Sequence, residues 1–134
     1  SDLALVAKAA ARALKPGGHF YFDVNTKLAF EEVWPLTWFV ERPDLVLVMH
    51  GDFDPLGGKA WSTAEFFLKR GGLWERHSER VEEVCWEDEE IRDALSRARF
   101  DNIRSRDATP YFGADSLVRR GHRTIYLARL ARKP

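Results

Sequence analysis

The chain has 134 residues, of which 45% are hydrophobic and 31% charged, a composition typical of one soluble globular domain with its own core. The 21 basic and 21 acidic residues cancel, which argues against a general attraction to nucleic acid or to an anionic membrane. No apolar run has the length of a membrane span, and no signal-peptide pattern is present. A lone cysteine, Cys85, excludes an intrachain disulfide, so we expect a reducing, cytoplasmic setting. Because Ser1 stands where an initiator methionine would, we expect a piece of a longer protein.

The first 26 residues predict a helix, a tight turn and a dense apolar strand. Leucine, valine and alanine recur at helical spacing over residues 3–14, and Pro16 followed by two glycines ends the helix. Residues 19–24 carry bulky side chains on both faces, which is typical of a central strand with helices on each side. Ligands of open α/β sheets bind beyond the carboxyl ends of such strands, so Asp23, Asn25 and Thr26 are the first candidate site residues.

The middle of the chain predicts a short helix over residues 27–33 and then four strands. The strands span residues 37–41, 45–53, 59–69 and 73–86, and the breaks between them are rich in Gly, Pro and Asp. Such short connections between consecutive strands indicate an antiparallel meander. The fourth strand is polar on much of both faces and is expected at an exposed edge. We expect the aromatic residues of the meander to form its core rather than a binding pocket.

The last part returns to an α/β pattern. Acidic residues from Glu87 to Glu90 favour a helix N-terminus, and an apolar stripe continues to Ala98. Strands are predicted over residues 100–107 and 122–130, with a loop between them that carries Tyr111 and Phe112.

This order of elements resembles the C-terminal half of the class I S-adenosylmethionine-dependent methyltransferases. The resemblance is carried by Leu-Lys-Pro-Gly-Gly at residues 14–18, Phe-Asp-Val-Asn-Thr at 22–26 and the helix that ends in Ala-Arg-Phe at 98–100, where the family usually has Ala-Gly-Phe. It implies an α/β fold: a partial Rossmann-like methyltransferase sheet of the last three strands with flanking helices, plus an inserted antiparallel β-meander. Residues 1–33 and 87–134 would belong to the Rossmann-like part and 34–86 to the insert.

The resemblance places the family's cofactor site outside this chain. The glycine-rich loop and the acidic residue that hold S-adenosylmethionine in the family would lie upstream of Ser1, so no cofactor-binding residue is assigned, and productive cofactor binding is expected only of a full-length protein. The strand over residues 19–24 would then present an unpaired apolar edge, which we expect an N-terminal half or a second copy of the chain to cover.

The resemblance implies methyl transfer to a small molecule, with this chain on the substrate side. Asp23, Asn25 and Thr26 would orient a hydroxyl or amine of the acceptor. Alternatively, Thr26 or Asn25 would cap a helix and the carboxylate of Asp23 would fix a loop. His50 and His77 are candidate bases, although histidines in polar strands are more often surface residues. Tyr111 would close over the substrate, or else anchor its own loop. No metal-ligand set is predicted, and the alternative function is a non-catalytic binding or assembly domain.

Overall fold

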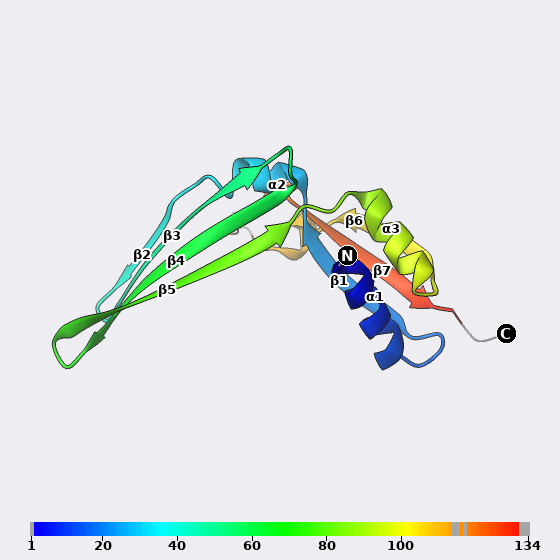
Figure 1. The fold of residues 1–134 in the computed structure, drawn as a ribbon, viewed down its shortest axis with the longest axis horizontal. Helices are drawn as coiled ribbons and strands as arrows, with labels where there is room; N and C mark the ends of the chain where they lie inside the picture. The colour runs from blue at the N-terminus through cyan, green and yellow to red at the C-terminus, as the bar shows by residue number, and fades with distance from the viewer. Residues whose placement is uncertain (1, 114–115, 117, 132–134) are drawn as a thin grey trace. The chain divides into compact units, whose positions relative to one another are not determined.

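The computed structural model describes residues 2–113, 116 and 118–131. The chain divides into two compact units, one formed by Ser1–Thr26 with Trp86–Pro134 and the other by Lys27–Cys85 (Figure 1). The sequence predicts an insert that begins at residue 34, whereas the short helix before that point belongs to the second unit. Phe30 of that helix packs on Phe53 and Ala60, which explains its place there.

The first unit is an α/β layer with one three-stranded sheet. It contains α1 (Asp2–Ala13), β1 (His19–Asn25), α3 (Asp88–Arg97), β6 (Phe100–Asp107), the 3-10 turn η1 (Thr109–Tyr111) and β7 (Arg123–Leu130). The strand order is β1-β7-β6, and β7 runs antiparallel to both neighbours. Within this sheet β1 pairs only with β7, so the unpaired edge expected for residues 19–24 is confirmed for the described residues.

Both helices of this unit cover the same face of the sheet. Residues of α1, α3 and all three strands share one core, in which Ile91 and Leu95 are the largest fully buried side chains of the helices. Phe20 and Phe22 face this core and stack at 4.7 Å between ring centroids. The expectation of helices on both faces of β1 is therefore wrong for the described residues, because Tyr21, on the other face, is 57% exposed.

The turn between α3 and β6 contains Arg99, which stands where the resembled family usually has glycine. Arg99 has a φ of 72°, in the left-handed region that glycine adopts without steric cost. Its carbonyl accepts a hydrogen bond of 2.9 Å from the amide of Ala131, and its own amide donates to Ser96. The tight turn therefore forms with arginine in place of glycine, at the cost of a strained backbone.

The second unit is the predicted meander with one short helix. It contains α2 (Lys27–Glu32), β2 (Trp38–Arg42), β3 (Leu45–Asp54), β4 (Lys59–Arg70) and β5 (Leu73–Val84), and the strands pair antiparallel in chain order. The exposed edge is also confirmed, because nearly every residue of β5 is exposed.

The aromatic residues of the meander do not form the core that we expected. The buried cluster consists of Phe30, Phe53 and Ala60, with Trp34 and Cys85 packed against it. Phe39 is 61% exposed and Trp74 48% exposed. The short helix α2 covers too little of the sheet to bury the remaining aromatic side chains.

Candidate functional site

The carboxyl end of β1 meets the start of β7 at a polar cluster centred on Arg123. The Nη1 of Arg123 lies 2.7 Å from Oδ2 of Asp23, and its Nε donates to Oδ1 of Asn25 at 2.9 Å. The side chains of Arg123 and Asp23 are 34% and 40% exposed, so the pair borders solvent. Two predicted site residues are thus held together by a third that sequence reasoning missed. The antiparallel register, with Asn25 opposite Arg123, is the signal that reveals it.

The loop after β6 supplies two aromatic rings beside this end of the sheet. The guanidinium carbon of Arg123 lies 5.8 Å from the ring centroid of Phe112, and that of Arg106 lies 5.1 Å from the ring of Tyr111. Both distances fall within the range of cation–π attraction. Tyr111 is 54% exposed, and this contact ties the predicted lid residue to β6.

Backbone hydrogen bonds fix the segment that leads into β7. The side chain of Thr26 donates to the carbonyl of Gly121, and its amide donates to His122. Asp107 accepts from the amides of Thr109 and Gly121 at 2.8 Å and 2.6 Å. Thr109, through its side chain and its amide, and the Gly121 amide hold the pKa of Asp107 below its ordinary value. Thr26 therefore anchors a loop in this structure, whereas the alternative role considered for it is the cap of the helix that follows.

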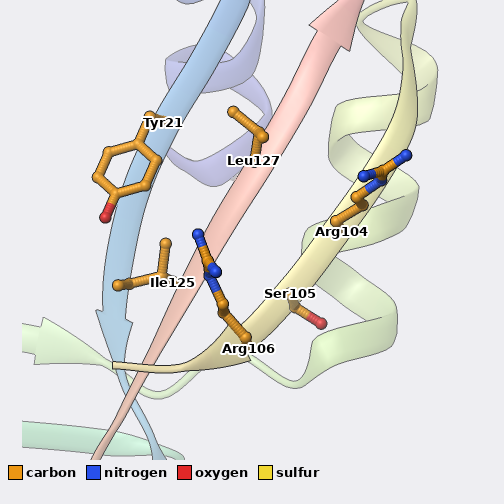
Figure 2. Close-up of a pocket in the computed structure, with 6 residues that line it drawn as sticks. All are labelled: Tyr21, Arg104, Ser105, Arg106, Ile125 and Leu127. Atoms are coloured by element: carbon orange, nitrogen blue, oxygen red, sulfur yellow. The ribbon is translucent and has the colours of Figure 1, made fainter. Parts of the chain in front are cut away.

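A pocket of about 250 Å³ lies on the same face of the sheet as this cluster. Its aromatic and aliphatic lining is Tyr21 from β1 with Ile125 and Leu127 from β7, and Figure 2 shows these side chains on one face beside Arg106 of β6. Asp23 lies opposite Ile125 on the neighbouring strand. This pair is two residues along each strand from Tyr21 and Leu127, which line the pocket, so both pairs lie on the same face. The pocket and the Arg123 cluster thus form one continuous candidate site.

Two arginines give the pocket a positive charge. Arg104 donates to the side chain of Asn102 at 3.2 Å, and Arg106 contacts the Tyr111 ring. Neither has an ion pair within the part of the chain that the structure describes. Ser105, between them, points to the opposite face and accepts a hydrogen bond from Arg92 of α3. The pocket therefore combines an apolar floor with two guanidinium groups, which favours a ligand that carries negative charge.

The two candidate histidines lie in the second unit, on opposite faces of its sheet. His50 is exposed on β3, opposite Thr63 of β4. His77 is on β5, and its Nε2 lies 3.3 Å from Oε1 of Glu75. The structure does not bring either of them together with the other predicted site residues inside one unit.

Comparison with solved structures gives the fold. A protein from Clostridium acetobutylicum described as an S-adenosylmethionine-dependent methyltransferase matches with a TM-score of 0.75 and 23% identity, over 97% of this chain and 51% of that one. DesVI of Streptomyces venezuelae matches with a TM-score of 0.69 and 15% identity, over 98% and 51%. The sugar N-methyltransferase KedS8 of Streptoalloteichus matches with a TM-score of 0.64 and 18% identity, over 97% and 49%. This chain has the fold of the C-terminal half of a class I methyltransferase.

The expected fold class, a partial methyltransferase sheet with an inserted antiparallel meander, is confirmed by this likeness and by the sheet topology. The chain spans about half the length of the solved structures that it matches. No family model matches the sequence, and no curated protein does.

The glycines of the described residues lie outside the strand-to-helix junctions. The two strand-to-helix junctions, at residues 25–27 and 84–88, contain no glycine. The paired glycines at residues 57–58 and 71–72 lie in hairpin turns. In the described part of the chain, no three histidine, cysteine or acidic side chains gather as a metal site, and no helix is long and apolar enough to cross a membrane.

Proposed function

We propose that this chain is the substrate-side half of an S-adenosylmethionine-dependent methyltransferase that acts on a small molecule. The fold similarity to methyltransferases supports this proposal, as do the descriptions of two of them, the sugar N-methyltransferase KedS8 and the amino pentose methyltransferase CalS10. The observation that carries it is the Arg123 cluster beside the pocket, at the carboxyl end of β1, where ligands of such sheets bind.

The role we assign to Asp23 is to bind and orient the acceptor. Arg123 occupies Oδ2 of Asp23, and a hydroxyl or amine of the acceptor would donate to Oδ1. Because Arg123 also donates to Asn25, it holds the side chains of Asp23 and Asn25 on one face at this end of the sheet. Orienting the acceptor in this way lowers the entropic part of the barrier to its reaction.

The pocket would hold the remainder of the acceptor. Ile125 and Leu127 offer an apolar surface for a ring, and Tyr21 offers an aromatic edge. Arg104 and Arg106 would bind an anionic substituent. The acceptor class that fits is a small ring compound with an amine or hydroxyl at one end and a negative charge elsewhere.

The cofactor would be bound by residues outside this chain. We infer that a further strand of the methyltransferase sheet pairs with the open edge of β1, because an apolar edge strand is otherwise a template for aggregation. The coding sequence upstream of Ser1 tests this directly, since a strand, a glycine-rich turn and a helix are expected there.

Acceptor binding is tested by nuclear magnetic resonance on the labelled 134-residue chain, with an anionic amino sugar as the probe. We expect chemical-shift changes at the amides of Asp23 and Ile125 and their neighbours. Asp23→Ala should weaken binding about tenfold, which corresponds to about 1.4 kcal/mol. Asp101→Ala is the matched control, because Asp101 makes an ion pair with Arg129 on the same face of the same sheet. Equal weakening by both variants, or shift changes confined to the second unit, would exclude the proposed site.

Catalysis is tested on the longer protein with S-adenosylmethionine present. Asp23→Ala should lower kcat/KM about tenfold, and Asp101→Ala should leave it unchanged. If the longer protein transfers no methyl group to any anionic amine or alcohol, the remaining explanation is a non-catalytic binding domain.

A further inference from the structure

The register of the three-stranded sheet places a negative and a positive charge at the two ends of one cross-strand row. Ile125 of β7 lies opposite Asp23 of β1 and also opposite Arg106 of β6. Residues that face each other across neighbouring strands share a face, so all three side chains lie on the side of the sheet that carries the pocket. We call these three residues the Ile125 row.

The two charges of the Ile125 row are not paired with each other. The ion pair of Asp23 is with Arg123, which lies along the strands on the side away from Tyr21 and the pocket. Arg106 contacts an aromatic ring, and no ion pair involves it in the described part of the chain. Two strand spacings of about 4.8 Å separate the backbones of Asp23 and Arg106 by about 10 Å. The sheet therefore holds opposite charges apart across the width of β7.

Arg106 is the pocket arginine that points toward the strand of Asp23. Figure 2 shows its guanidinium directed over β7 toward Ile125, whereas the side chain of Arg104 is directed away from β7. Arg104 also lies opposite Leu127, one row further from Asp23 than Arg106 does. An anion bound within reach of Asp23 would therefore contact Arg106 before Arg104.

The centre of the Ile125 row is shielded from water. Ile125 is 5% exposed, although both helices of the unit cover the other face of the sheet. Attraction between charges is stronger where water is excluded, so a ligand with a charge at each end of this row gains more than it would on an open surface. Tyr21, which is 57% exposed, and Leu127 offer apolar contact beside the row.

We propose that the acceptor is a zwitterion whose ammonium group and carboxylate lie at opposite ends of a small ring. This inference rests on the proposed function, because it names the acceptor class of the same site. The ammonium group would donate to Asp23, and the carboxylate would accept from the guanidinium of Arg106. The ring would lie against Leu127 and Tyr21. A ligand with only one charge, or with both charges at one end, contacts only half of the row.

The span of the Ile125 row sets the length of this acceptor. Because Arg106 leans over β7, its charge lies between one and two strand spacings from Asp23, about 5–10 Å. An extended chain advances about 1.2 Å per bond, so the two bonds between the charged groups of an α-amino acid cover about 2.4 Å, which is too short. The five bonds across trans-4-aminocyclohexanecarboxylate cover about 6 Å, which fits the row.

Nuclear magnetic resonance titration of the isotope-labelled 134-residue chain tests the proposal, with trans-4-aminocyclohexanecarboxylate as the probe. The matched control ligand is its isomer 1-aminocyclohexanecarboxylate, which has the same ring and the same charges but carries both on one carbon. We expect the probe to shift the amides of Asp23, Ile125 and Arg106, and to bind about tenfold more tightly than the isomer. Equal affinity of the two compounds would overturn the proposal.

Substitution of the two pocket arginines tests which of them holds the carboxylate. Arg106→Gln should weaken binding of the probe about tenfold, because it removes a charged donor to the carboxylate. Arg104→Gln should weaken it less than about threefold, because a more distant charge is screened by salt. Circular dichroism establishes that both variants are folded. A larger loss from Arg104→Gln than from Arg106→Gln would contradict the assignment.

Cyclohexylamine separates a direct role of Arg106 from a structural one. This ligand keeps the ring and the ammonium group but lacks the carboxylate. Arg106→Gln should not weaken its binding, because the substitution removes a positive charge and leaves Asp23 in place. Equal losses for cyclohexylamine and for the zwitterion would mean that Arg106 only supports the fold of the site, and the proposal would be wrong.

The titrations also separate this inference from the proposed function. If the zwitterion fails to bind while the anionic amino sugar shifts the amides of Asp23 and Ile125, the acceptor class is wrong and the proposed site stands. If neither compound shifts these amides, both the acceptor class and the proposed site are wrong.

Discussion

Replacement of Arg123 by methionine tests whether the cluster at the end of β1 is a built feature or a chance surface contact. Methionine keeps the length and the apolar stem of the side chain while it removes the charge and all donors. The variant therefore breaks three contacts at once: the ion pair with Asp23, the hydrogen bond to Asn25 and the contact with Phe112.

The expected loss of unfolding free energy is about 2 kcal/mol. An ion pair with more than a third of each side chain exposed contributes about 0.5 kcal/mol. The hydrogen bond from a charged donor to Asn25 contributes about 1 kcal/mol in this half-exposed setting. The Phe112 contact, at 5.8 Å, adds about 0.5 kcal/mol.

Arg129→Met is the matched control for this measurement. Arg129 lies on the same strand and the same face, and it pairs with Asp101 through two contacts of 2.9 Å and 3.2 Å. Both side chains are nearly half exposed, so the expected loss is only about 0.5–1 kcal/mol. Thermal unfolding followed by circular dichroism should show Arg123→Met melting about 4 °C below Arg129→Met. If the two variants melt together, the contacts to Asn25 and Phe112 contribute nothing, and the cluster has no special rigidity.

Three further substitutions test other parts of the structure. Arg99→Gly should raise the unfolding free energy by about 0.5–1 kcal/mol in urea denaturation, because its φ of 72° is unstrained only for glycine; an unchanged midpoint would count against strain at this turn. Phe30→Ala should cost about 3–4 kcal/mol and increase hydrogen exchange in the second unit first, because the side chain is 1% exposed; uniform exchange across both units would contradict this. The hydrogen bonds from Arg92 and Tyr126 lower the pKa of Asp88, so its contribution to stability is present above the ordinary value of 3.8 and is lost as pH falls through the folded pKa. Asp88→Asn should therefore flatten the fall of melting temperature with acid, and a parallel fall in both proteins would refute this.

The sequence predicts the elements of this fold well because each boundary has a local chemical cause. Pro16 ends α1, the glycines at residues 71–72 shape the hairpin before β5, and acidic residues begin α3. The burial of each face is harder to predict. Tyr21 alternates with Phe20 and Phe22, and bulk on both faces indicates two covered faces, yet only one face is covered here. Hydrophobicity indicates that burial of a side chain is favourable. Only the topology shows whether a helix or strand is present to bury it.

The candidate site is predicted in part. The three residues at the end of β1 follow from the rule for open α/β sheets, and the structure shows that each of them is held by residues about a hundred positions later in the chain. Arg123 carries no local motif, so only the pairing of β1 with β7 identifies it. His50 and His77 are candidate bases on their chemistry alone, and only the register of the meander assigns them to opposite faces.

The two roles considered for the end of β1, loop anchoring and acceptor binding, are compatible, because they use different atoms. Thr26 uses its hydroxyl and amide on the backbone before β7, and Asp23 uses Oδ2 on Arg123. A carboxylate with one oxygen in an ion pair has a fixed orientation, and its second oxygen then presents a defined direction to a ligand. In the proposed site, the structural contacts would thus be a condition for precise acceptor binding rather than an alternative to it. We therefore expect Asp23→Asn to keep most of the stability, because its carbonyl still accepts from Arg123, and to weaken binding of a charged amine more than that of a neutral alcohol. Titration of both ligands into both proteins tests it, and equal losses for the two ligands would mean that the charge at Asp23 has no part in recognition.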